Sequence, residues 1–253
     1  MPRITTLTTL FAATWREWRL RPVQRVVLVV GAAVIDTLVL FLTAYAFDRW
    51  RKFVPDSDLV SLRYLLGPVV VCPPVFFLSF LSTMHRGLAE LDPRAPDARR
   101  VVAALVRLAA VLAFADCWLW PLALAVGAGV ATALRWYPDY GAAVGWALAW
   151  TATRIWLGAP ESSIVEGHFG VRVALRRSRA RGWARGSLAP THLLCAVMGI
   201  VAAFEFSDTN TNLTVFFFAI LQLIVSIDAA SSAAWHKLGP RERSFEDVAR
   251  VFR

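Results

Sequence analysis

Long apolar runs constrain this chain more than any other feature of its sequence. A run of about 20 apolar residues matches the thickness of the hydrocarbon core of a bilayer. Hydrophobic residues make up 57% of the chain, whereas a soluble domain has about 45–50%. The sequence therefore predicts an all-α polytopic membrane protein with six transmembrane helices plus interfacial amphipathic helices. The six runs are Val26–Phe47, Leu65–Met84, Ala103–Leu134, Ala142–Ala159, Pro190–Phe206 and Leu213–Trp235.

These runs divide the chain into one integral membrane domain over residues 1–253. Residues 1–25 are predicted to contain an interfacial helix, 26–235 the six-span bundle, and 236–253 a cytoplasmic tail. The third run is longer than one straight span needs, so a bend is expected near Pro121 or at Gly127 and Gly129. The fourth begins with Gly141-Ala-Ala-Val-Gly145, whose small residues allow close helix approach. We expect that contact to be internal.

The distribution of basic residues predicts the orientation. The N-terminal segment, the loops after spans two and four, and the tail together hold 20 Lys and Arg, against 5 in the other loops. Basic loops face the cytoplasm, so both termini are expected there. The net charge of +9 lies beside apolar runs, which indicates anionic lipid as the partner and argues against nucleic acid. The preference for Arg over Lys is typical of a GC-rich bacterial genome, which predicts a bacterial inner-membrane location.

Three segments have the pattern of interfacial helices. Thr6–Leu20 places apolar side chains, including Trp15 and Trp18, on one helical face. Ser162–Arg179 mixes apolar residues with arginines, and Ser244–Phe252 places its apolar residues on one side. Each pattern is that of a helix lying in the headgroup plane.

The loop after the fourth run resembles a known family in its order of residues. The resemblance is to the bacterial six-helix membrane domain that is fused to some glycerophosphoryl diester phosphodiesterases and also occurs alone. The phosphodiesterase domain itself is missing from this sequence, so the resemblance implies a membrane fold and no hydrolase. The matching residues are Pro160, Ile164, Val165, Glu166, Gly167, Ala174, Leu175, Arg176, Arg177 and Ser178.

Three carboxylates fall within predicted spans. Asp36, Asp116 and Asp228 lie some distance from the ends of the first, third and sixth runs. A charged carboxylate at mid-membrane costs about 2.5–3.5 kcal/mol on insertion scales, so such groups face protein, water or a partner. We expect all three to point into protein. Three interpretations remain open at this stage: structural contacts to Ser, Thr or Trp, contact with a partner or lipid, and ion handling.

The arginine-rich loop is a candidate surface for anionic lipid or an acidic partner. Together with the two interfacial tryptophans, Trp15 and Trp18, it forms the predicted lipid- or partner-binding set. The alternative is that these charges only fix the orientation of the chain in the membrane. The loop residues are Arg172, Arg176, Arg177, Arg179 and Arg181.

The sequence contains no recognisable catalytic or metal-binding motif. Its three cysteines lie inside apolar runs without ligand spacing, which is typical of buried thiols. The four histidines fall near the predicted cytoplasmic boundary and match no metal motif. We therefore expect no enzyme activity, no metal and no cofactor.

Three functions fit these observations. The first is a non-enzymatic accessory or scaffolding subunit of a larger bacterial inner-membrane assembly, in contact with other membrane subunits. The second is a permease subunit of an ATP-driven exporter, because such partners also begin with an amphipathic cytoplasmic helix. The third is a small ion-coupled transporter that uses Asp36, Asp116 and Asp228.

Overall fold

The computed structural model describes residues 7–53, 60–135, 137–167, 170–180, 192–197 and 211–238. Within these ranges the chain is helical and forms no strand, as predicted. A further short helical stretch covers residues 192–197. The named helices are α1 (Leu7–Arg19), α2 (Pro22–Phe53), α3 (Val60–Glu90), α4 (Ala98–Ala133), α5 (Pro138–Leu157), α6 (Pro160–Val165), α7 (Val171–Ala180) and α9 (Thr211–Leu238).

Three stretches of the described residues are long and apolar enough to cross a membrane. They are Pro22–Ala46 in α2, Ala98–Ala133 in α4 and Phe218–Lys237 in α9. The helices α2, α3 and α9 contain three of the six predicted runs, and α4 and α5 cover two more except for the last residue of one and the last two of the other. Each is longer than its run at one or both ends, because polar residues at the ends of a span can continue the helix. Of the fifth run, only residues 192–197 are described.

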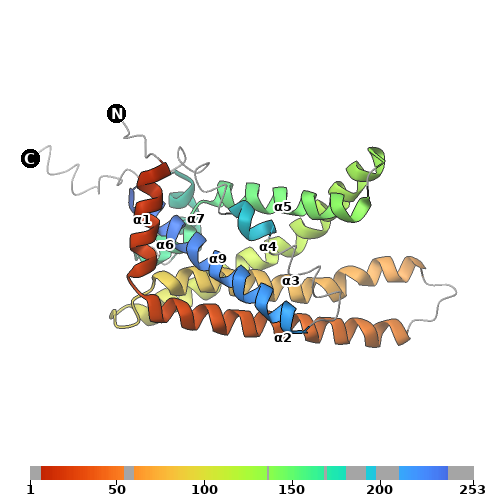
Figure 1. Cartoon of the computed structure of the whole chain (residues 1–253), viewed down its shortest axis with the longest axis horizontal. Coiled ribbons are helices and arrows are strands. Elements are labelled where there is room, and N and C mark those ends of the chain that lie inside the picture. The colour runs from red at the N-terminus through yellow and green to blue at the C-terminus, as the bar shows by residue number, and fades with distance from the viewer. Residues whose placement is uncertain are drawn as a thin grey trace, which may run out of the picture.

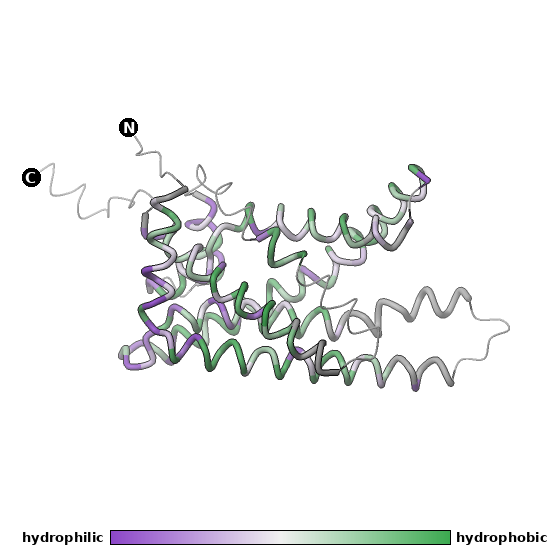
Figure 2. The backbone as a smooth tube through the Cα atoms, viewed as in Figure 1, coloured by the Kyte–Doolittle hydropathy of each residue, from purple (hydrophilic) through white to green (hydrophobic). Residues whose placement is uncertain are grey.

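The bundle has one end that is much more polar than the rest. Figure 1 shows α1, α6, α7, the end of α9 and the α3–α4 connection gathered at the left, where α2 begins. Figure 2 shows hydrophilic residues concentrated there, whereas the long helices beyond are mostly hydrophobic. We call this the polar end. Such segregation is expected of helices that cross a hydrocarbon layer and are joined outside it.

A close contact joins α4 to α5. Gly127 of α4 lies against Gly141 and Gly145 of α5, where a Cβ atom on Gly127 would meet the Gly141 carbonyl. The Gly141–Gly145 motif therefore serves internal contact, as predicted. By contrast, Gly129, two residues along α4, has open space where a Cβ would lie.

The core at the polar end brings α6 and α7 against the long helices. Ile164 of α6 and Ala174 of α7 are fully buried in one cluster with Leu105 and Leu108 of α4. The prediction of one interfacial helix over Ser162–Arg179 is wrong in two respects. The segment is two helices, and α6 is buried because it fills the space between the ends of α3, α4 and α9.

Helix α1 lies across α9 and is only partly exposed. Leu10 is buried against α9, and the hydroxyls of Thr14 and Ser231 lie 3.2 Å apart. Phe11 remains 75% exposed, and Trp15 is half-exposed. The predicted apolar face therefore has two parts, one against α9 and one facing outward. The segment Ser244–Phe252 lies outside the described residues.

Candidate functional site

A buried ion pair links α3 to α9. The carboxylate of Asp228 lies 2.5 Å from the guanidinium of Arg86. Its second oxygen lies 2.8 Å from Nδ1 of His192, in the short helical stretch 192–197. All three side chains are almost fully buried. Asp228 therefore holds three separate parts of the chain together. Its partners are ionisable groups, whereas the structural interpretation, one of the three left open, had named Ser, Thr or Trp.

A second buried ion pair joins α5 to α6. The guanidinium of Arg154 donates to Glu161 at 3.1 Å, and both side chains are 4% exposed. The ring of Trp150 connects the two ion pairs, because Arg86 and Arg154 lie 5.7 and 5.5 Å from its centroid. Cation–π contacts of this kind are strongest where the cation is removed from water. The network therefore reaches from α9 through α3 and α5 to α6.

Asp36 belongs to a chain of polar contacts between α2, α9 and α3. The amide of Gln222 donates to the Asp36 carboxylate. The amide oxygen of Gln222 lies 2.8 Å from Nδ1 of His85. All three side chains are buried. Gln222 precedes Asp228 by six residues, about 9 Å along α9, so α9 carries both sets of contacts.

Asp116 is buried and accepts a hydrogen bond from the hydroxyl of Ser79, which links α4 to α3. The prediction that Asp36, Asp116 and Asp228 point into protein is thus confirmed. Each makes its own contacts to other helices, and the hydrogen bonds and ion pairs of the described residues do not join the three to one another.

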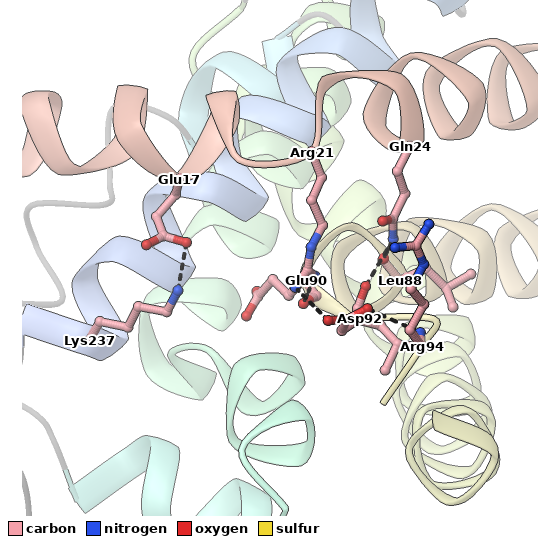
Figure 3. Close-up of polar contacts among 9 residues, drawn as sticks. Glu17, Arg21, Gln24, Leu88, Glu90, Asp92, Arg94 and Lys237 are labelled. Atoms are coloured by element: carbon pink, nitrogen blue, oxygen red, sulfur yellow. Dashed lines mark hydrogen bonds and ion pairs between the residues drawn. The ribbon is translucent and has the colours of Figure 1, made fainter. Parts of the chain in front are cut away.

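At the polar end, the elbow between α1 and α2 is fixed to the end of α3. Arg21 donates to the main-chain oxygen of Glu90, and Gln24 donates to that of Leu88 at 2.5 Å. Arg21 also lies 3.9 Å from the Asp92 carboxylate. Figure 3 shows both elbow side chains reaching toward the end of α3. The elbow therefore sets where α1 leaves the bundle.

A pocket opens beside this elbow, and we call it the elbow pocket. It holds about 90 Å³ of space between the ends of α1, α2, α3, α6 and α9. Its walls carry Arg21, Arg25, Glu90 and Lys237, with apolar contacts from residues such as Ala233. In Figure 3, Glu90 lies between Arg21 and the Glu17–Lys237 pair. This volume is enough for several water molecules or one small ion.

The Glu90 carboxyl is the most perturbed acid at the polar end. Loss of contact with water raises its pKa to about 8, and the nearby Glu161 carboxylate adds to this shift. A hydrogen bond from the Ser162 hydroxyl at 2.9 Å opposes the shift, as do the charges of Lys237 and Arg25. The shift favours the protonated form of Glu90, in which the carboxyl can donate a hydrogen bond, although the residue as a whole is only half-buried.

The predicted lipid- or partner-binding residues lie on two different helices. On α7, Arg172, Arg176 and Arg179 are exposed and Arg177 is partly exposed. Arg179 stacks 3.5 Å over the ring of Trp156. On α1, the rings of Trp15 and Trp18 stack at 5.8 Å. Arg181 lies outside the described residues.

Several residues of the resemblance have structural roles. The Ser178 hydroxyl donates to the Leu157 carbonyl at 2.6 Å. It also lies close to Gly158, whose φ of 73° suits glycine. Glu166 lies 2.8 Å from the His236 imidazole. These contacts fix the α6–α7 unit to the ends of α5 and α9.

Comparison with family models, curated proteins and solved structures finds no significant match to this chain. What the site can do chemically must therefore be argued from its geometry. Among the described residues, no three His, Cys, Asp or Glu side chains are grouped so that they could hold a metal ion. The described chemistry is that of ion pairs and hydrogen bonds between helices, with one pocket at the polar end.

Sequence reasoning missed the two arginines and the glutamine that complete the network. Arg86 was counted only among the loop charges that set orientation, Arg154 was noted only as a charge inside a span, and Gln222 was not singled out. A signal did exist, because a carboxylate inside a span needs a compensating group. Arg154 and Gln222 are the polar residues with which such a search would have begun.

Proposed function

We propose that this chain is a non-enzymatic accessory or scaffolding subunit of a bacterial inner-membrane assembly. In this proposal six helices span the membrane and both termini lie in the cytoplasm. The main support is the use of the buried carboxylates. Asp36, Asp116 and Asp228 each contact a side chain on another part of the bundle. Groups engaged in this way hold helices together and are poorly placed to bind and release a passing ion.

The outward-facing surface gives further support. Along α2, apolar side chains from Val23 to Tyr45 are exposed, and on α4 a second set includes Phe114 and Trp118. Exposed apolar patches on this scale mark contact with membrane or protein. In the proposed function lipid covers part of this surface and other membrane subunits cover the rest.

The polar end supports the proposed orientation. It carries α1, whose Trp15 and Arg19 lie 4.6 Å apart in a cation–π contact, and the basic face of α7. Both are expected at a cytoplasmic surface with anionic lipid. Reporter fusions at Phe245 and within Trp136–Tyr140 test this orientation. Opposite compartment signals are expected, and equal signals would refute six spans.

Purification without crosslinking tests the accessory role. The tagged chain is extracted in mild detergent, and mass spectrometry identifies every protein that remains bound. Stable recovery of a large membrane complex is the expected result. Recovery with an ATPase would instead indicate a permease subunit.

A liposome assay tests the third alternative, a small ion-coupled transporter. The scaffolding proposal is wrong if the chain purifies alone and drives proton-linked uptake into liposomes, and if Asp36→Asn abolishes this uptake while the variant remains folded. Asp97→Asn is the matched control, because Asp97 is exposed and pairs only loosely with Arg100, at 3.9 Å.

A further inference from the structure

Most of the charged groups that line the elbow pocket are engaged with one another. Glu17 pairs with Lys237 at 2.6 Å, and Glu166 lies 2.8 Å from His236. Arg21 faces Asp92 outside the pocket. Two ionisable groups of the wall, Arg25 and Glu90, remain outside these pairs.

Arg25 is buried and forms no ion pair among the described residues, although the Glu90 and Glu17 charges act on it from a greater distance. Only 2% of the residue is exposed. Its guanidinium donates to the main-chain oxygens of Ser226 at 3.0 Å and Glu17 at 3.4 Å, and its Nε has no hydrogen-bond partner among the described residues. Main-chain oxygens accept hydrogen bonds but carry no full charge. A buried cation in this setting is stabilised by an anion.

Glu90 lines the same pocket but forms no ion pair with Arg25 among the described residues. Its pKa is raised to about 8, which favours the protonated form at neutral pH. A protonated carboxyl presents an O–H donor, so Glu90 and Arg25 can both donate to one ligand. An anion with several oxygen atoms suits this combination, and arginine is the side chain best matched to phosphate oxygens.

We propose that the elbow pocket is a binding site for a phosphate group, with Arg25 as the central cation and Lys237 at the rim. The Lys237 side chain is 55% exposed, so a ligand can reach the pocket from the polar end. A phospholipid headgroup and a free phosphate share this chemistry. The site is independent of the accessory role proposed above and of the basic surface on α7.

The test uses the full chain in a maltoside detergent, which contains no phosphate. Inorganic phosphate is titrated by calorimetry. Separately, phosphatidylglycerol or diacylglycerol is added to delipidated protein, and native mass spectrometry measures the retained lipid. Diacylglycerol is the control for the lipid arm, because it lacks the phosphate group.

The expected result is saturable binding of phosphate, of phosphatidylglycerol, or of both, and no retention of diacylglycerol. Arg25→Gln should weaken that binding about tenfold or more, since a charged hydrogen-bond partner is lost. Arg100→Gln removes the same charge from an exposed position on α4, where Arg100 pairs only loosely with Asp97 at 3.9 Å, and should leave the affinity unchanged. Whether the free ion or the lipid binds identifies the source.

Two results would overturn the site. One is the absence of saturable binding of either probe. The other is an equal loss of affinity in Arg100→Gln and Arg25→Gln, which would assign the effect to general positive charge. If Arg25→Gln fails to fold, Lys237→Gln is the variant that tests the phosphate site. It should weaken binding about two- to fivefold, and an unchanged affinity would count against the proposal.

Discussion

The ion pair between Arg86 and Asp228 allows the most quantitative prediction. Replacing Asp228 by Leu leaves the Arg86 guanidinium buried, with a side chain only 4% exposed, and removes the partner of His192. Breaking one side of a buried pair costs about 3–5 kcal/mol. For a chain of this size that corresponds to a fall in Tm of roughly 6–20 °C.

The assay is thermal unfolding in detergent, followed by intrinsic fluorescence of the 11 tryptophans. The control is Asp97→Leu, which breaks an exposed pair at 3.9 Å and should cost at most about 1 kcal/mol. Adding Arg86→Met to Asp228→Leu should recover at least about 2 kcal/mol, because no buried charge is then left unpaired.

The same reasoning separates the three aspartates. Asp→Asn removes charge but keeps hydrogen-bonding capacity. It should be mild at Asp36 and Asp116, whose partners are an amide and a hydroxyl. At Asp228 it should be severe, because the partner is a buried cation. An Asp228→Leu variant as stable as the original protein, or three equally mild Asn variants, would refute the argument.

Three further predictions follow from other contacts. Gly127→Ala should destabilise the chain by about 1–3 kcal/mol in denaturation, because its Cβ meets α5, whereas Gly129→Ala should not. The raised pKa of Glu90 means that the folded state holds this proton more tightly. The free energy of unfolding should therefore fall as pH rises from about 4.5 to about 8, and Glu90→Gln should flatten that profile in urea titrations. A spin label at Phe11 should be accessible to lipid-soluble relaxants and one at Leu10 should not; equal accessibility would contradict the docking of α1 on α9.

The sequence predicted the helical membrane fold because apolar runs of bilayer length have few other solutions. Burial of Asp36 was predictable for the same energetic reason. The residues that contact the buried aspartates could not be predicted. They depend on which helices lie side by side, and a periodic pattern does not encode that arrangement. The pairing of Arg154 with Glu161, for example, depends on α6 folding back into the bundle.

The elbow pocket could not be predicted from the sequence. It combines residues from five helices. That Arg25 forms no ion pair among the described residues can be seen only when the side chains around Arg25 are known. The interpretation of Ser162–Arg179 as one surface helix failed for a related reason. A short buried helix such as α6 carries no amphipathic pattern that distinguishes it from a loop.

The contact between α1 and α9 has a consequence for how the chain is made. Thr14 meets Ser231 across 217 positions, and Glu17 meets Lys237 across 220. A ribosome therefore releases the first helix long before its partner exists. Until α9 emerges, the apolar face of α1 cannot pack against that helix. An amphipathic helix such as α1 can lie in the membrane surface during this interval. Final closure of the bundle is then a late step, and truncation before Ser231 should leave the N-terminal helix open to protease.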